Sequence, residues 1–337
     1  MKYLNDFTES NNIEFPLIMA PMFLVSNEKM IQAAIDNGIL GVFPSLNFRE
    51  PERLNEVIEN LNRYKQEKPG NYGVNLIVQK TNVYFEKHLK ICIDNKVPFY
   101  ITSLGNPAKV IEAAHEYGAK VYCDVTNLEH AEKCYKLNCD GFIAVGQGAG
   151  GHAGPNPLHV LIPALQENFP DKPVIAAGGI ATGKAMLSVM SLGAQGVSVG
   201  TRFIASQESD VNNAYKQAIV DAGMDDIVMT TKISGTPLSI INTEYAKKIG
   251  YEQNWLEKLL TKNPKTKKWF KMLVQYRGMK KIEQSLLPAN YKTLWSAGKS
   301  VQEIHEIFTV KAIVEKFKEE FEASLNETCA LKNNIKQ

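Results

Sequence analysis

The stretch DGFIAVGQGAGGHAGPNPLHVLIPALQENFPDKPVIAAGGIATG at residues 140–183 decides the predicted fold. It begins with a short apolar run at 140–145, continues through a glycine-rich loop and a helical segment, and reaches a second apolar run at 173–177. Short apolar runs bounded by glycine or proline are typical of strands that are buried on both faces. The stretch therefore predicts one strand–helix–strand unit of a parallel sheet.

The same alternation extends outward in both directions, from Leu17 to Ser206. Eight apolar runs lie at 17–20, 39–43, 72–77, 97–102, 119–123, 140–145, 173–177 and 196–200. A doubly wound sheet usually has about five to seven strands and one dominant phosphate-binding turn near its start, whereas a closed barrel has eight equivalent units. The number of runs, and the glycines after the last three, favour a (β/α)8 TIM barrel within residues 1–206.

The segments between these runs carry helix signals. Pro51 and Pro107 each open a stretch with apolar residues at helical spacing, and Asn127 and Thr182 are candidate N-caps of two others. Glycines stand where three of the helices are expected to stop, at positions 38, 118 and 193. The helices of an α/β fold are therefore predicted between the strands.

The alternation ends after Ser206. Residues 207–299 show several helical stretches, including those around Trp255 and Trp269, and no clear strand–helix unit. Residues 301–323 are again amphipathic, with Ile304, Ile307 and others at helical spacing. We expect a helical domain at 207–299 that forms part of the substrate pocket over the barrel mouth, and a C-terminal segment, 300–337, whose helix returns to the barrel.

Composition narrows the class of protein. The 337 residues have a formal net charge of +2, and the five cysteines form no C-x-x-C pair. This pattern predicts free thiols in a reducing compartment, with no metal site. The N-terminal residues are polar rather than signal-like, and no apolar run reaches the length of a membrane span. We expect a cytoplasmic enzyme.

One basic stretch requires a separate interpretation. Residues 243–283 contain eleven Lys or Arg against four Glu. A solvated helix face is the common explanation of such a stretch, and a surface for an acidic carrier protein is another. Nucleic-acid or membrane binding is a third, but the aromatic residues lie among apolar neighbours at helical spacing and the net charge is near zero. Neither a nucleic acid nor a membrane is therefore an expected partner.

Active sites of such barrels are built from the loops that follow the strands. The loop after 173–177 contains Gly178 and Gly179, and Gly200 and Thr201 follow 196–200. Glycines let backbone N–H groups approach a phosphate, and barrels often bind phosphate between these two loops. The alternative is that the glycines only form tight turns. Their coincidence at the expected place favours a phosphate site.

The loop after 140–145 contains a histidine among glycines. Gly146, Gly148 and Gly151 formally match G-x-G-x-x-G, but His-Ala-Gly-Pro-Asn-Pro follows instead of a helix, so a dinucleotide fingerprint is rejected. His152 can exchange a proton near neutral pH, and its place at a strand end makes it the candidate general acid/base. The other five histidines lie in helical patterns.

The first and third strands supply weaker candidates. Ala20-Pro21-Met22 follows the first strand, and Asn75 lies within the third. An amide side chain can both donate and accept hydrogen bonds, and the turn can present backbone groups to a ring. Core packing explains the same residues equally well.

Five motifs in this order resemble one protein family. They are P-L-I-M-A-P-M at 16–22, G-V-N-L at 73–76, G-A-G-G-H-A-G at 148–154, A-A-G-G-I-A-T-G at 176–183 and G-V-S-V-G-T-R-F at 196–203, with a weaker match in L-W-S-A-G at 294–298. The chain resembles the nitronate monooxygenases, formerly 2-nitropropane dioxygenases, a family that also includes flavin-dependent enoyl-acyl-carrier-protein reductases.

The resemblance implies an FMN-containing barrel with His152 in the catalytic position. In the monooxygenases the substrate, a nitronate or nitroalkane, reduces the flavin and O2 reoxidises it, while the reductases use NAD(P)H. The sequence leaves a homodimer open. The implied cofactor-binding residues are Pro21, Met22, Asn75, Asp124, Gln147, Gly150, Gly151, Gly178, Gly179, Gly200 and Thr201.

Two positions depart from the family pattern. Gly148 stands where many relatives have Glu, and Asp124 aligns with a Lys that some relatives place near the flavin. A carboxylate cannot supply the positive charge that favours an anionic flavin. The resemblance therefore specifies the family more closely than it specifies the substrate.

Overall fold

The computed structural model describes residues 2–232, 237–252 and 294–331, and its centre is a closed barrel of eight parallel strands. The barrel strands are β1 (Leu17–Met19), β2 (Leu40–Pro44), β3 (Asn71–Ile77), β4 (Phe99–Ser103), β5 (Lys120–Val125), β6 (Gly141–Val145), β8 (Val174–Ala177) and β9 (Gly196–Val199). β1 pairs with both β2 and β9, which closes the sheet. The predicted TIM barrel is confirmed.

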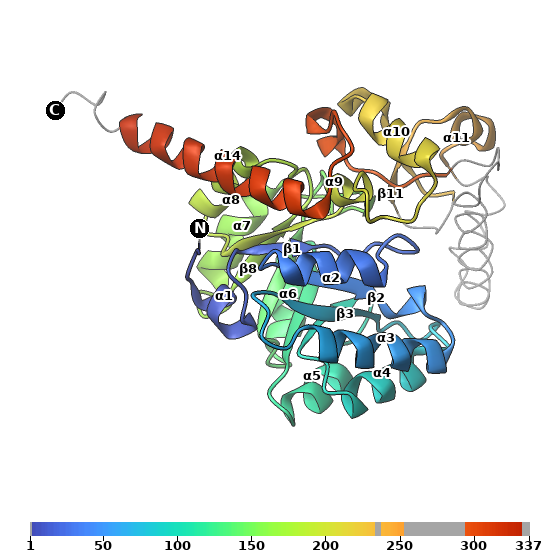
Figure 1. Cartoon of the computed structure of the whole chain (residues 1–337), viewed down its shortest axis with the longest axis vertical. Helices are drawn as coiled ribbons and strands as arrows, with labels where there is room; N and C mark the ends of the chain where they lie inside the picture. Colours follow the sequence, from blue (N-terminus) through green and yellow to red (C-terminus); the bar gives the residue numbers. More distant parts are fainter. Residues whose placement is uncertain (1, 233–236, 253–293, 332–337) are drawn as a thin grey trace.

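Helices surround the barrel on its outer side (Figure 1). They are α2 (Glu28–Asp36), α3 (Pro51–Tyr64), α4 (Phe85–Asp94), α5 (Ala108–His115), α6 (Leu128–Tyr135), α7 (Leu158–Asn168) and α8 (Gly183–Ser191). The helix starts agree with those predicted. The side chains of Asn127 and Thr182 accept hydrogen bonds from backbone N–H groups in the first turns of α6 and α8, and Pro51 is the first residue of α3.

Two apolar layers stabilise this architecture. Side chains such as Ile18, Ile101 and Ile175 point inward and fill the barrel, while a second core lies between the strands and the helices. The short helix α1 (Asp6–Asn11) contributes Phe7 to the inner core, where its ring packs 5.8 Å from that of Tyr122. The end of the barrel at which the strands begin is therefore filled, and the opposite end remains for the loops.

The segment after residue 206 differs from the all-helical expectation. It contains α10 (Asn213–Asp221), the 3-10 turn η2 (Met224–Asp226), β10 (Ile227–Thr230), β11 (Leu238–Ile241) and α11 (Glu244–Ile249). β10 and β11 form an antiparallel sheet whose third strand, β7 (Gly151–His152), belongs to the loop after β6. The two longer strands are only four residues each, too short to show a clear period. The expected helices around Trp255 and Trp269 lie outside the described residues.

The C-terminal helix begins later than expected. After α9 (Thr201–Ile204) and the appended segment, the 3-10 turn η3 (Lys299–Glu303) leads through an extended connection into α14 (Val310–Leu331). The N–H of Val310 donates a hydrogen bond to the carboxylate of Glu208. This bond fixes the start of the helix at Val310 rather than at residue 301. His305 lies in the connection, so its assignment to a helix was wrong. α14 packs along α8 at the side of the barrel (Figure 1).

The five cysteines are free, as predicted: Cys329 is exposed, and the other four are buried. Within the described ranges, no helix combines the length and the apolar character needed to cross a membrane.

Candidate functional site

The predicted site residues gather at the end of the barrel where the strands terminate. Pro21 and Met22 follow β1, Asn75 lies in β3 and Asp124 in β5, and the glycine loops follow β6, β8 and β9. Because all eight strands are parallel, these positions share one rim. The three-stranded sheet of β10, β11 and β7 also lies at this rim, because β7 belongs to the loop after β6 (Figure 1).

The loops after β6 and β8 contact each other through their backbones. Gly178 and Gly179 have φ angles of +119° and +75°, in the region that favours glycine. A Cβ on Gly178 would meet the nitrogen of Ala149 at 2.7 Å, and one on Gly148 would meet the Cα of Gly179 at 2.9 Å. The Glu that many relatives have at position 148 would therefore require a different arrangement of these loops.

Gly200 has no such constraint from the protein. Its φ of −107° is available to any residue, and an added Cβ would only touch Ala20 and Met22 at 3.7 Å. A side chain is thus tolerated by the fold here, but it would stand beside the first amides of α9. A glycine at this position suits the close approach of a phosphate group.

Thr201 connects the rim to the C-terminal part of the chain. Its Oγ1 accepts a hydrogen bond from the N–H of Gly298 at 3.0 Å, which leaves the hydroxyl hydrogen to be donated elsewhere. A Cβ on Gly298 would meet the carbonyl oxygen of Gly148 at 2.5 Å and the nitrogen of Gly150 at 2.8 Å. Gly298 therefore lies against two rim loops, and it is a site residue that sequence reasoning missed.

We call residues 294–298 the strap, because they join the appended segment to the rim. Trp295 stacks on Tyr215 with the ring centroids 5.3 Å apart, and the Tyr215 hydroxyl donates to the carbonyl of Ser296 at 2.6 Å. Ile241 donates to the carbonyl of Trp295 at 2.8 Å. The weak L-W-S-A-G match was the only signal in the sequence for this element.

His152 occupies an exposed position on β7. It pairs with Leu238 of β11, and Gly151 before it has a φ of +70°. The backbone of the histidine is therefore held by the appended sheet on one side and by the glycine loop on the other. An exposed histidine whose backbone is held at the rim can exchange protons with solvent or a bound molecule near neutral pH.

A polar network covers the inner core on the side of β3, β4 and β5. Asn75 donates through Nδ2 to the Ser103 hydroxyl at 2.8 Å and to the Ile101 carbonyl at 3.1 Å, and the Ser103 hydroxyl donates to a carboxylate oxygen of Asp124. Burial raises the pKa of Asp124 to about 6, and the hydrogen bond from Ser103 opposes that rise. Ser103 was not predicted as a site residue.

Some predicted contacts are already used within the protein. The Met22 N–H donates to the Ser26 hydroxyl at 3.0 Å, and Asn47 donates to the Met22 carbonyl at 3.0 Å. The Met22 carbonyl also accepts from the N–H groups of Val25 and Ser26, both at 3.1 Å, so Met22 can offer a ligand its side chain but not its backbone groups. The side chain of Gln147 is exposed.

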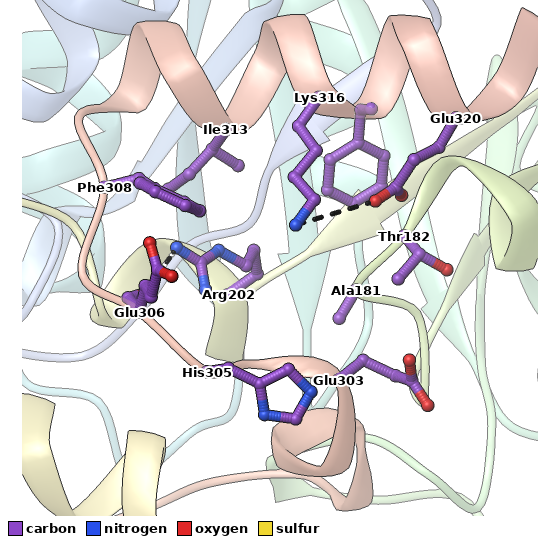
Figure 2. Close-up of a pocket in the computed structure, with 11 residues that line it drawn as sticks. Ala181, Thr182, Arg202, Glu303, His305, Glu306, Phe308, Ile313, Lys316 and Glu320 are labelled. Atoms are coloured by element: carbon purple, nitrogen blue, oxygen red, sulfur yellow. Dashed lines mark hydrogen bonds and ion pairs between the residues drawn. The ribbon is translucent and has the colours of Figure 1, made fainter.

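A separate cavity of about 140 Å³ lies beneath α14 (Figure 2). Arg202 lines it and donates to the carbonyl of Glu306 at 2.8 Å, with Phe308 5.3 Å from its guanidinium. Burial lowers the pKa of Arg202 to about 10. Neither His152 nor the rim glycines line this cavity. Three carboxylates among its lining residues do not suit an anionic ligand, so we assign Arg202 to holding the C-terminal connection.

Comparisons with known proteins agree with this description. A family profile described as nitronate monooxygenase matches residues 46–320. The (3aS,4S,5R,7aS)-5-hydroxy-7a-methyl-1-oxo-octahydro-1H-indene-4-carboxyl-CoA dehydrogenase of Mycobacterium tuberculosis is 29% identical, covering 74% of this chain and 69% of that protein. A probable nitronate monooxygenase of Staphylococcus haemolyticus is 29% identical, covering 75% and 83%.

Solved structures give the same fold. FabK from Thermotoga maritima is 30% identical with a TM-score of 0.84, covering 99% of this chain and all of that one. A nitroalkane oxidase from Streptomyces ansochromogenes has a TM-score of 0.79 at 21% identity, covering 95% of this chain and 99% of that one, a likeness of fold alone.

Proposed function

The chain belongs to the nitronate monooxygenase family, and from this membership we propose that it is an oxidoreductase that holds FMN at the rim and oxidises alkyl nitronates or nitroalkanes with O2. The observation that carries the proposal is the glycine-lined rim, with Gly178 and Gly179 at positive φ and Gly200 free of steric conflict, beside a histidine on β7. Such a rim suits the phosphate of a flavin nucleotide, and the histidine suits proton transfer.

The residues have separate tasks in this proposal. FMN, when bound, supplies the electron acceptor. The backbone of Gly178, Gly179 and Gly200 and the hydroxyl of Thr201 would hold its phosphate, since glycines let backbone N–H groups approach a phosphate closely. His152 removes the proton from the carbon next to the nitro group of a neutral nitroalkane. A nitronate has already lost that proton, so its oxidation does not require His152 to act as a base.

A second candidate is NAD(P)H-dependent reduction of an enoyl thioester. It is favoured by the similarity to FabK over the whole chain, and by the carboxyl-CoA group in the name of the Mycobacterium tuberculosis relative. A thioester carbonyl acidifies the neighbouring C–H as a nitro group does, so the same histidine suits both substrates. The two candidates differ in the electron donor.

An anaerobic spectrum separates these candidates. The purified protein is expected to show the visible bands of bound flavin, and we would add propionate 3-nitronate, NADH, NADPH and an enoyl-CoA in separate samples. Loss of the flavin bands with the nitronate alone supports the first candidate. Loss of the bands only with a nicotinamide supports the second. Absence of a flavin spectrum after incubation with FMN contradicts both.

A further inference from the structure

The barrel strands contain a single carboxylate, and it lies at the rim. Among the residues of the eight described strands, Asp124 is the only Asp or Glu. Ile101 and Tyr122 belong to the core inside the barrel, and side chains alternate along a strand, so Ser103 and Asp124, two residues further on, also point inward. Asp124 therefore faces the interior at the end where the cofactor is proposed to bind.

The polar network of β3, β4 and β5 fixes the direction of this carboxylate. The Ser103 hydroxyl donates a hydrogen bond to Asp124 and accepts one from the side-chain amide of Asn75, which is 5% exposed. The three residues come from three neighbouring strands, so their relative positions are set by the register of the sheet. Next to β5 around the barrel, β6 and β8 end inward in Val145 and Ala177, which are apolar. Asp124 therefore places one charged side chain beside an apolar stretch of the rim.

We infer that Asp124, positioned by Ser103 and Asn75, is the residue whose charge sets the preference of the site for oxidised over reduced flavin. The inference rests on the proposed function, because it requires FMN at the rim. Two-electron reduction with uptake of one proton adds one negative charge to a flavin ring, whereas uptake of two protons adds none. A fixed carboxylate opposes the first product, and charge near the ring nitrogens is a known means of tuning flavins.

The test measures the dissociation constants of FMN and of reduced FMN at pH 8, where Asp124 is ionised, by anaerobic fluorescence titration. In Asp124→Asn the neutral amide keeps the size of the side chain and still accepts from Ser103. We expect the ratio of the two constants to shift by about tenfold toward tighter binding of reduced FMN. The flavin reduction potential of the variant should rise correspondingly.

Three further variants make the result specific. Ser103→Ala removes the hydrogen bond that compensates part of the carboxylate charge and fixes its direction, so the ratio should differ from that of wild type, while Ser103→Thr keeps a hydroxyl and should stay near wild type. Asp171→Asn removes an exposed carboxylate before β8, at the other end of the barrel, and should change nothing.

The outcomes separate the inference from the proposed function. If the wild-type protein binds no FMN, the proposed function fails and this inference falls with it. If FMN binds and the ratio is the same in wild type and Asp124→Asn, the proposed function stands and the inference is wrong. An equal shift in Asp171→Asn would also overturn it, since the effect would then be that of net charge.

Discussion

At the scale of single residues, His152 is the clearest target. Replacing it with alanine removes the imidazole from an exposed position on β7, so the fold and the retention of flavin should be unaffected. We expect turnover of a neutral nitroalkane to fall by roughly 10²–10⁴, the usual range for loss of a general base. Steady-state oxygen consumption with a nitroalkane and with its nitronate is the measurement. A similar loss with both substrates would contradict a role in removing the substrate proton.

Asp124 makes a second residue-scale prediction, about stability and pH. Its pKa of about 6 in the folded protein lies above the value of about 3.9 expected when unfolded. The folded state therefore binds more protons between these values, and this contribution to stability is present below pH 4 and is lost as the pH rises through 6. In flavin-free protein, Asp124→Asn should be more stable than wild type by about 3 kcal/mol at pH 8. Urea denaturation should show the difference shrinking toward pH 4, and a difference independent of pH would contradict the prediction.

At the scale of elements, the strap has the most direct test. Gly298→Ala places a methyl group against the carbonyl of Gly148 and the nitrogen of Gly150, so it should displace the loop after β6. We expect a loss of FMN affinity of about tenfold or more, measured by fluorescence titration. Gly223→Ala is the matched control, because an added Cβ there meets nothing closer than 3.4 Å. Unchanged affinity in Gly298→Ala would show that the strap does not support the cofactor loops.

The connection between η3 and α14 depends on Arg202. Arg202→Met keeps an apolar side chain but removes the guanidinium, and with it the charged hydrogen bond to the Glu306 carbonyl and the contact with the Phe308 ring. We expect the free energy of unfolding to fall by about 1.5–3 kcal/mol, the range for a hydrogen bond to a charged group. Chemical denaturation of the variant tests this, and Lys316→Met, which removes an exposed cation from the same cavity wall, should cost much less. Equal losses in the two variants would contradict the assignment.

At the scale of the whole molecule, the barrel was predictable because its signals repeat. Each strand is an apolar run bounded by turn residues, and caps such as Asn127 and Thr182 mark the helices locally. The appended segment has no such repeat: β10 and β11 are short, and β7 exists only because β11 lies beside it. A two-residue strand has no local signature, so no reading of residues 146–155 alone reveals it.

The residues of the candidate site also divide into those with a local sequence signal and those without one. The glycines and His152 are concentrated in loops that the fold places together, which made them visible in the sequence. Ser103 and Gly298 were missed because their roles depend on contacts with residues distant in the sequence. Ser103 forms hydrogen bonds with residues of β3 and β5, and Gly298 lies against the loop after β6. Contacts of this kind arise from strand register and chain packing, and a single sequence does not contain them.

The shared strand β7 also bears on how such an enzyme changes over generations. Its two residues belong to a barrel loop, yet their pairing partner is β11 of the appended segment. Selection on that segment for a new substrate therefore acts at the same time on the orientation of His152. In this architecture, a mutation in β11 that alters substrate binding can also alter the position of His152. The same mutations can therefore change both the substrate range and the proton transfer.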